Sequence, residues 1–225
     1  MSVKFTRTSP SPRYVELLSL YRKMHAEGYV EKGDRDVHVP PEQTFRGSQL
    51  PKFVHPIKEL IDCHSALSIL DYGAGKGHQY GPLALALPSG ETFPDIKSFW
   101  AVDQISCYDP AVPGVDVLPN SSFDGVVCTD VLEHCPVEDI PWIVKELFDH
   151  ATKFVFANIA CYPAKKTLPS GENAHCTVRH PEWWGGLFTA ISDSFPDIDY
   201  ELNITAHVKN AEGGSELQML RTKRQ

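Results

Sequence analysis

The chain of 225 residues, 42% of them hydrophobic, is long enough for one medium-sized domain with a substantial core. Its formal net charge of −8 argues against a nucleic-acid groove, which needs clustered lysines and arginines. No apolar run is long enough for a transmembrane helix, and residues 1–12 lack the apolar core of a signal peptide. The six cysteines form no C-x-x-C pair, so we expect reduced thiols and a cytoplasmic protein.

Two helices are predicted ahead of the first strand. Apolar residues recur at helical spacing from Tyr14 to Met24, with Ser11 as a start signal and Gly28 as a stop signal. A loop rich in Gly, Asp and Pro follows over residues 29–48. The apolar pattern then predicts a second amphipathic helix from about Leu50 to Cys63.

A glycine-rich turn follows the first predicted strand. Ala66–Leu70 is a short apolar run, as in a strand buried on both faces, and Asp71 leads from it into three glycines at alternate positions. Glycine adopts positive φ at no steric cost and lets a ligand approach the backbone closely. Tyr80–Leu87 has the pattern of a helix, whose free N-terminal N–H groups favour an electron-rich ligand. The sequence therefore predicts a ligand cradle that contains Asp71, Gly73, Gly75 and Gly77.

The spacing of the glycines narrows the class of ligand. A dinucleotide-binding turn has the pattern G-x-G-x-x-G, and a phosphate-binding P-loop has G-x-x-x-x-G-K-[ST]. Residues 71–77 have neither pattern and read D-x-G-x-G-x-G. A turn of this pattern that closes a first strand resembles motif I of the class I S-adenosylmethionine-dependent methyltransferases. The resemblance implies that Asp71 and the three glycines bind S-adenosylmethionine (S-adenosyl-L-methionine).

Two segments compete for the position of the second strand. Ser98–Val102 would end at Asp103, and Ile105–Tyr108 would end at Asp109. An acidic residue that closes the second strand is the usual partner of a ribose diol, because a carboxylate accepts hydrogen bonds from both hydroxyls. We favour Asp109 as the ribose-binding residue, since a turn signal follows it, and keep Asp103 as the alternative.

A later stretch extends the resemblance. The segment Val115–Pro119 precedes the predicted strand Phe123–Cys128, and Asp130–His134 follows that strand at its carboxyl end, where ligands bind in parallel sheets. The order D-x-L-P, F-D-x-V and V-L-E-H resembles the third and fourth strand region of the same methyltransferases. The resemblance implies that Asp116 meets the adenine amino group. It also implies that the V-L-E-H segment lines the methionine side of the cofactor, with Asp130 in the same pocket.

The next elements lead to a polar loop. The apolar pattern predicts a helix over residues 138–150 and a fifth strand over 153–159. Residues 160–188 then form a loop that carries Asn, His, Arg and two Trp residues, and a further helix is expected over 181–192. A polar, aromatic loop after a central strand is well placed to build a substrate pocket.

The polar loop supplies candidates for substrate binding and catalysis. Asn173, Arg179 and Trp183 are the candidate substrate contacts, although Trp183 fits helix packing equally well. His175 is the preferred general base, because it lies in the loop and not on a packed face. His134 is a second candidate base, for which a cofactor-pocket or structural role is the competing interpretation.

A zinc site is the rival interpretation of the thiols and imidazoles near this edge of the sheet. Their spacing matches no standard zinc pattern, and cysteines in strands are usually small core residues. We therefore expect no metal at the set Cys135, Cys161, His134, His175 and Cys176.

The end of the chain completes the predicted fold. Asp199–Val208 and Ser215–Leu220, on either side of the turn Lys209–Gly214, predict an antiparallel hairpin. We predict a single α/β domain, a Rossmann-like three-layer sandwich with a mostly parallel seven-stranded sheet and this C-terminal hairpin. Its core spans residues 65–225, and residues 1–64 form an N-terminal helical extension.

The resemblance implies a function as well as a fold. It implies an S-adenosylmethionine-dependent methyltransferase but does not specify the acceptor. The acidic chain and the aromatic loop favour a small-molecule or sugar acceptor over nucleic acid, with a protein acceptor as the alternative, and we expect no membrane partner. The resemblance further implies that the leading helices form a lid with Phe45 and Arg46 near the ligand, whereas a plain surface helix pair is the competing interpretation. A non-catalytic cofactor-binding or regulatory protein on the same scaffold is the alternative, because fold does not fix function. The sequence leaves the acceptor and the oligomeric state open.

Overall fold

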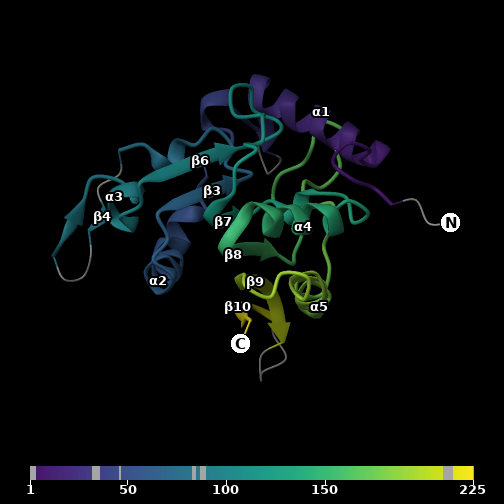
Figure 1. Cartoon of the computed structure of the whole chain (residues 1–225). Coiled ribbons are helices and arrows are strands. Elements are labelled where there is room, and N and C mark those ends of the chain that lie inside the picture. The colour runs from purple at the N-terminus through teal and green to yellow at the C-terminus, as the bar shows by residue number, and fades with distance from the viewer. Residues whose placement is uncertain are drawn as a thin grey trace.

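A mixed sheet of six strands forms the centre of the computed structural model (Figure 1). The structure describes residues 4–31, 36–45, 47–82, 85–86, 90–209 and 215–224. Within these residues the strand order of the sheet is β10-β9-β8-β7-β3-β6. In chain order its strands are β3 (Ser68–Tyr72), β6 (Gln104–Tyr108), β7 (Phe123–Thr129), β8 (Ala151–Ala160), β9 (Asp199–Lys209) and β10 (Ser215–Lys223).

The strands of this sheet are parallel except for the last. β3 pairs in parallel with β6 and β7, β7 with β8, and β8 with β9, whereas β10 runs antiparallel to β9. The predicted C-terminal hairpin is therefore confirmed, although residues 210–214 of its turn lie outside the described residues. Seven strands were expected; the described part of the sheet has six, and Val115–Leu118 is irregular.

Helices cover both faces of the sheet (Figure 1). On one face lie α2 (Val54–His64), which a short 3-10 turn (Leu50–Phe53) precedes, and α3 (Ile96–Trp100). On the other face lie α4 (Ile140–His150) and α5 (Pro181–Ser192). Two apolar clusters result, one on each side, and they hold the strands in place by burying nearly every apolar residue of β3, β7 and β8.

Helix α1 (Pro12–Glu27) crosses the carboxyl ends of the parallel strands, along the upper edge of Figure 1. It begins and ends where the sequence predicts: the Ser11 hydroxyl accepts from the N–H of Tyr14, and Gly28 terminates the helix at a φ of 81°. A small antiparallel pair, β1 (Tyr29–Glu31) with β2 (Val37–Val39), and a 3-10 turn (Pro41–Gln43) follow.

The helix predicted over Tyr80–Leu87 is wrong. The described residues of this segment hold a 3-10 turn (His78–Tyr80) and then β4 (Leu85–Ala86), which pairs with β5 (Thr92–Phe93). Gly81 is extended, with φ of −66° and ψ of 175°, and Pro82 after it has no N–H to donate. The chain therefore leaves the glycine turn without a helix N-terminus, although the apolar residues beyond it have a helical pattern.

Of the two segments considered for the second strand, the structure has the later one, which lies in β6. Ser98–Val102 contains the end of α3, which Asp95 caps by accepting from the N–H of Ser98 at 2.7 Å. The second candidate, Ile105–Tyr108, lies in β6, so Asp109 is the residue at the carboxyl end of the second parallel strand. Asp103 lies exposed at the opposite end.

Two further findings concern the chain as a whole. Among the described residues, none of the helices combines the length and the apolar character that a membrane crossing requires. All six cysteines are free thiols.

Candidate functional site

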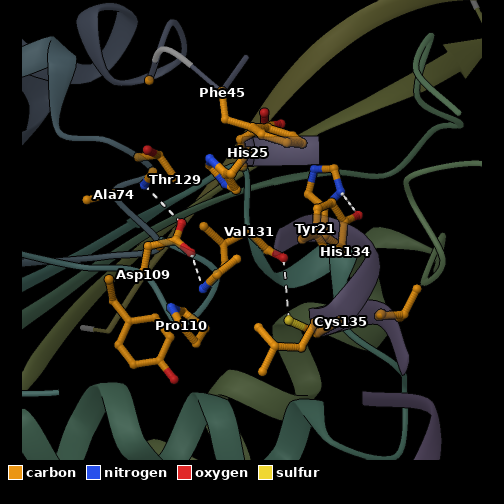
Figure 2. A pocket seen from close by; sticks show the side chains of 18 of the residues that line it. Tyr21, His25, Phe45, Ala74, Asp109, Pro110, Thr129, Val131, His134 and Cys135 are labelled. Carbon is orange, nitrogen blue, oxygen red and sulfur yellow. Dashed lines mark hydrogen bonds between the residues drawn. The ribbon is translucent and has the colours of Figure 1, made fainter. Parts of the chain in front are cut away.

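A pocket opens at the carboxyl ends of the parallel strands, under α1 (Figure 2). Its floor is formed by residues 72–75 after β3, 109–111 after β6 and 129–136 after β7, with Lys166 from the loop after β8. Binding at this edge is typical of parallel sheets, because the strand-to-helix connections there leave a crevice. The outer wall is formed by α1 and the loop behind it, through Tyr14, Leu17, Leu18, Tyr21, His25, Phe45, Gly47, Ser48 and Gln49.

The glycine turn lines the floor of the pocket, but its N–H groups are already used. The N–H groups of Gly73 and Ala74 donate to the carbonyl of Tyr108, at 2.7 and 3.0 Å. The N–H of Gly75 donates to Asp109 at 3.0 Å. The predicted cradle of free N–H donors at a helix N-terminus is therefore absent from the described residues. A Cβ on Gly73 would lie 2.3 Å from Val131, so the turn instead allows close packing.

Asp109 is the carboxylate that faces the pocket beside this turn. Its Oδ2 accepts from the N–H of Gly75 and its Oδ1 from the N–H of Ala111, at 3.0 and 2.8 Å (Figure 2). Burial raises the pKa of its carboxyl, and the two N–H donors act in the opposite direction. Each oxygen keeps a second lone pair, so the fixed carboxylate can still accept from hydroxyl groups of a ligand.

Asp71 supports the turn from below and does not line the pocket. Its side chain is buried, and its Oδ2 accepts from Gln79 Nε2 and from the Tyr80 hydroxyl, both at 2.9 Å. Burial raises its pKa to about 6. Gly77 also lies away from the pocket lining, since a Cβ there would meet Cys107 Sγ at 3.2 Å.

Four other predicted site residues lie outside the pocket lining. Asp116 is exposed in the irregular segment before β7, where it accepts from the N–H of Gly114. Arg179 is exposed, and its guanidinium lies 6.0 Å from the ring centroid of Trp183, a residue of α5 that packs against the core. Asn173 braces the loop after β8: its Oδ1 accepts from the N–H groups of Ala164 and His175, both at 2.9 Å.

Three ligand-type side chains come together at one side of the pocket. Asp130 and His134 line the pocket after β7, and His175 reaches them from the loop after β8. One side-chain atom from each lies within 4.8 Å of the other two. The two imidazole rings are perpendicular, with centroids 4.7 Å apart. We name Asp130, His134 and His175 the histidine cluster.

Burial controls the charge in this region. Burial, opposed by Asp130 and helped by the neighbouring His175, lowers the pKa of His134 to about 4, so the imidazole is neutral at neutral pH. The buried Glu133 accepts from the N–H of Ala160 through Oε1, while its Oε2 has no partner among the described residues. Burial and the nearby Asp130 raise the pKa of Glu133 well above its usual range, which favours the neutral acid.

Sequence reasoning missed several residues of the pocket wall. Tyr21 belongs to the apolar stripe of α1, which predicts burial but not what the stripe covers; its hydroxyl lies 2.8 Å from His134 Nδ1 (Figure 2). Lys166 had no signal in the sequence. Its ammonium lies over the rings of Phe45 and Tyr29, 4.9 and 5.4 Å from their centroids, and burial lowers its pKa. Arg46 lies outside the described residues.

The comparisons with known proteins give no family. No protein-family model matches the chain, and no curated protein matches it either. The chemistry of the site is therefore inferred from its geometry. The pocket lies between the strand ends and a covering helix, and it contains a fixed carboxylate beside a glycine turn. A second carboxylate and two imidazoles lie together at one side of the pocket.

Proposed function

We propose that the protein is an S-adenosylmethionine-dependent methyltransferase with a Rossmann-like core. One observation carries the proposal: the glycine turn after β3 and Asp109 after β6 are hydrogen-bonded to each other at 3.0 Å and line the same pocket. A ribose diol needs two acceptor positions close together, and a backbone without side chains lets the nucleoside lie against the turn. Both features occur here together, at the strand ends where such ligands bind.

The N–H groups of the turn favour this cofactor over a dinucleotide. A pyrophosphate is held by free backbone N–H groups at the start of a helix. The N–H groups of residues 73–75 are bonded to Tyr108 and Asp109, and no α-helix starts within residues 76–82. The cofactor proposed here has no phosphate, so it does not require those donors. The pocket therefore fits a nucleoside with an amino-acid side chain better than NAD.

The chemistry is an in-line displacement at carbon. A lone pair of the acceptor forms the new bond to the methyl carbon as the bond from that carbon to sulfur breaks. Sulfur would keep the bonding pair and become a neutral thioether, and a hydroxyl acceptor would pass its proton to water or to the carboxylate of Asp130 in the same pocket. Most of the acceleration comes from holding acceptor and methyl group in line. Asp130 and His134, which line the same pocket, stand where the acceptor would lie.

The shape of the pocket favours a small acceptor. Helix α1 covers it and is fastened at both ends. Near its start the N–H of Ser11 donates to Asp139, the residue before α4, at 3.0 Å. Near its end the ammonium of Lys76 donates to the carbonyl of His25 at 3.1 Å. Because aromatic side chains lie on the wall and Asp109, Asp130 and His134 lie on the floor, we propose a hydroxyl-bearing small molecule or sugar as the acceptor.

Calorimetric titration tests the cofactor. We expect S-adenosylmethionine and its demethylated product to bind with micromolar dissociation constants and NAD not to bind. Asp109→Ala should weaken binding of the product at least about tenfold through the lost ribose contact. Asp103→Ala is the matched control, because this carboxylate is exposed at the other end of β6, and it should leave binding unchanged. Binding of NAD alone, or equal effects of the two variants, would overturn the proposal.

A further inference from the structure

The histidine cluster has the side chains of a metal centre. It brings two imidazoles and one carboxylate within 4.8 Å of one another, although 45 positions separate Asp130 from His175 in the chain. Two of its three members line the pocket, and the third lies directly behind them. A cation bound there would therefore be reached from the same space as a small acceptor.

The hydrogen bonds of the two histidines leave the same nitrogen free on each ring. His134 Nδ1 lies 3.0 Å from the carbonyl of Ala174, and His175 Nδ1 lies 2.6 Å from the carbonyl of Tyr162. A carbonyl only accepts hydrogen bonds, so His175 Nδ1 carries the proton. The Tyr21 hydroxyl, which lies 2.8 Å from His134 Nδ1, donates its one proton to the Ala174 carbonyl at 2.9 Å, so His134 Nδ1 is also a donor. Each Nε2 therefore carries a lone pair. Histidines that bind metals are typically oriented in this way, with the other ring nitrogen donating to a backbone carbonyl.

The carboxylate of the cluster is also available. Among the described residues, the side chain of Asp130 has no hydrogen-bond or ion-pair partner. Asp130 itself has a φ of 61°, a conformation that costs energy for a residue with a side chain. The ammonium of Lys166 lies over two aromatic rings; it interacts electrostatically with Asp130 but forms no ion pair with it. A partly buried carboxylate without a hydrogen-bond or ion-pair partner favours a bound cation.

We propose that Asp130, His134 and His175 bind one divalent transition-metal ion at the inner side of the pocket. The donor set of two nitrogens and one oxygen suits Zn²⁺, Mn²⁺, Fe²⁺ or Co²⁺, whereas Mg²⁺ and Ca²⁺ prefer oxygen alone. Three protein ligands leave at least one coordination position open, as in catalytic and not in structural sites.

The donor set differs from the zinc site that the sequence suggested. The cysteines of that set are used elsewhere or lie at the surface: Cys135 Sγ donates to the carbonyl of Val131 at 3.6 Å, and Cys176 is exposed. Asp130, which sequence reasoning assigned to the cofactor, takes their place. A carboxylate is a harder ligand than a thiolate. With a carboxylate in place of the thiolates, the cluster resembles a metal site with an open coordination position more than a structural zinc site.

The role of the ion rests on the proposed function, whereas its binding does not. A divalent cation that coordinates an acceptor hydroxyl lowers the pKa of that hydroxyl, in the way that zinc lowers the pKa of bound water. The acceptor would then be a molecule that offers an oxygen atom to the metal. This narrows the proposed substrate class from small molecules in general to small alcohols or phenols that can coordinate a metal ion.

Absorption titration with Co²⁺ tests the site without any cofactor. The full chain, freed of metal with a chelator, should bind one Co²⁺ and show visible d–d bands without a thiolate charge-transfer band. Asp130→Asn, which keeps the shape of the side chain, and His175→Gln should each weaken Co²⁺ binding by more than about tenfold. His180→Gln is the matched control, because this histidine is exposed at the start of α5.

The outcomes separate the two proposals. No stoichiometric Co²⁺ binding, a thiolate band, or equal affinity in Asp130→Asn and His180→Gln would overturn the metal site. None of these results bears on binding of S-adenosylmethionine to Asp109 and the glycine turn, which the calorimetric titration measures separately. Conversely, a protein that binds Co²⁺ at this cluster but does not bind S-adenosylmethionine would keep the metal site and lose the proposed function.

Discussion

Two clusters of polar side chains lie along α1, and they differ in how completely they are satisfied. The first, the anchor cluster, consists of Arg7, Tyr72, Tyr108 and Glu146. The guanidinium of Arg7 donates to both carboxylate oxygens of Glu146, to Tyr108 Oη at 2.9 Å and to Tyr72 Oη at 3.1 Å. Tyr72 in turn donates to Glu146 at 2.7 Å.

The second is the histidine cluster, in which the two Nε2 atoms and the carboxylate of Asp130 have no hydrogen bond among the described residues. A network whose groups all have partners stabilises the fold, because no buried polar group loses hydration without compensation. A cluster that holds ligand-type atoms of three residues within 4.8 Å of one another and leaves acceptors without partners is suited to a ligand and contributes little to stability. Polar residues of similar type therefore have different roles in the two clusters: those of the anchor cluster stabilise the fold, and those of the histidine cluster are suited to bind a ligand.

The largest effect is expected from breaking the anchor cluster. Glu146→Ala leaves Arg7 and the Tyr72 hydroxyl without their acceptor, so we expect a loss of about 2–3 kcal/mol in the free energy of unfolding, less than a fully buried pair because Arg7 is partly exposed. Urea unfolding measures it. Asp149→Ala removes an exposed ion pair with Lys145 on the same helix and should cost about 0.5 kcal/mol or less. Equal losses would contradict the comparison.

A smaller, pH-dependent effect is expected at Asp71, whose partners include no cation. Its pKa in the folded protein is about 6, above the value near 4 of an unfolded chain, so the folded state holds a proton that the unfolded state has released. Stability should therefore fall as the pH rises from about 4 to about 6. Asp71→Asn keeps an oxygen for Gln79 and Tyr80 and should gain about 2 kcal/mol at pH 7.

The matched measurement for Asp71 is a pair of unfolding curves at pH 4 and pH 7. The wild-type protein and Asp71→Asn should be similar in stability at pH 4 and diverge at pH 7. A variant that is less stable at pH 7 would show that the carboxylate is ionised and held by its donors.

A single hydroxyl of the anchor cluster gives the next smaller effect. Tyr72→Phe removes the hydrogen bond to Glu146 and the longer one accepted from Arg7, while Arg7 still occupies the carboxylate, so the expected loss is about 1 kcal/mol. The shift of the urea midpoint at constant slope measures it. A loss as large as that of Glu146→Ala would mean that the network depends on the tyrosine more than on the ion pair.

The smallest effect is expected in the histidine cluster. Asp130→Asn in metal-free protein should change the free energy of unfolding by no more than about 0.5 kcal/mol, because the carboxylate has no partner to lose. Added Co²⁺ at 100 times its dissociation constant should stabilise the wild-type protein by about 2.7 kcal/mol and this variant far less. Thermal unfolding with and without Co²⁺ gives both numbers. Strong destabilisation of the metal-free variant would assign Asp130 a structural role.

Local signals made much of the fold predictable. The capping residue Ser11, the stop at Gly28, the buried runs of β3, β7 and β8, and the hairpin of β9 and β10 each depend on neighbouring residues, and each lies where it was expected. Asp109 could be preferred over Asp103 for the same reason, since a turn after a short apolar run marks the end of a strand.

The remaining features depend on contacts between distant segments. The helix expected after the glycine turn was wrong because the extended Gly81 and the proline after it divert the chain into β4. The histidine cluster was not predictable as a set, because the loop after β8 must fold back through Asn173 before His175 meets His134. Sequence spacing does not encode such a return, and the same holds for Lys166 and for the placement of α1 over the pocket.

A crystal structure with S-adenosylhomocysteine, the demethylated product, tests the central claim most directly. We expect the nucleoside against the glycine turn, with both ribose hydroxyls donating to Asp109 and the thioether sulfur directed toward Asp130 and His134. Density for the nucleoside at Asp116 or elsewhere on the surface, or ribose hydroxyls bonded to another residue, would contradict the proposed site and with it the proposed methyltransferase.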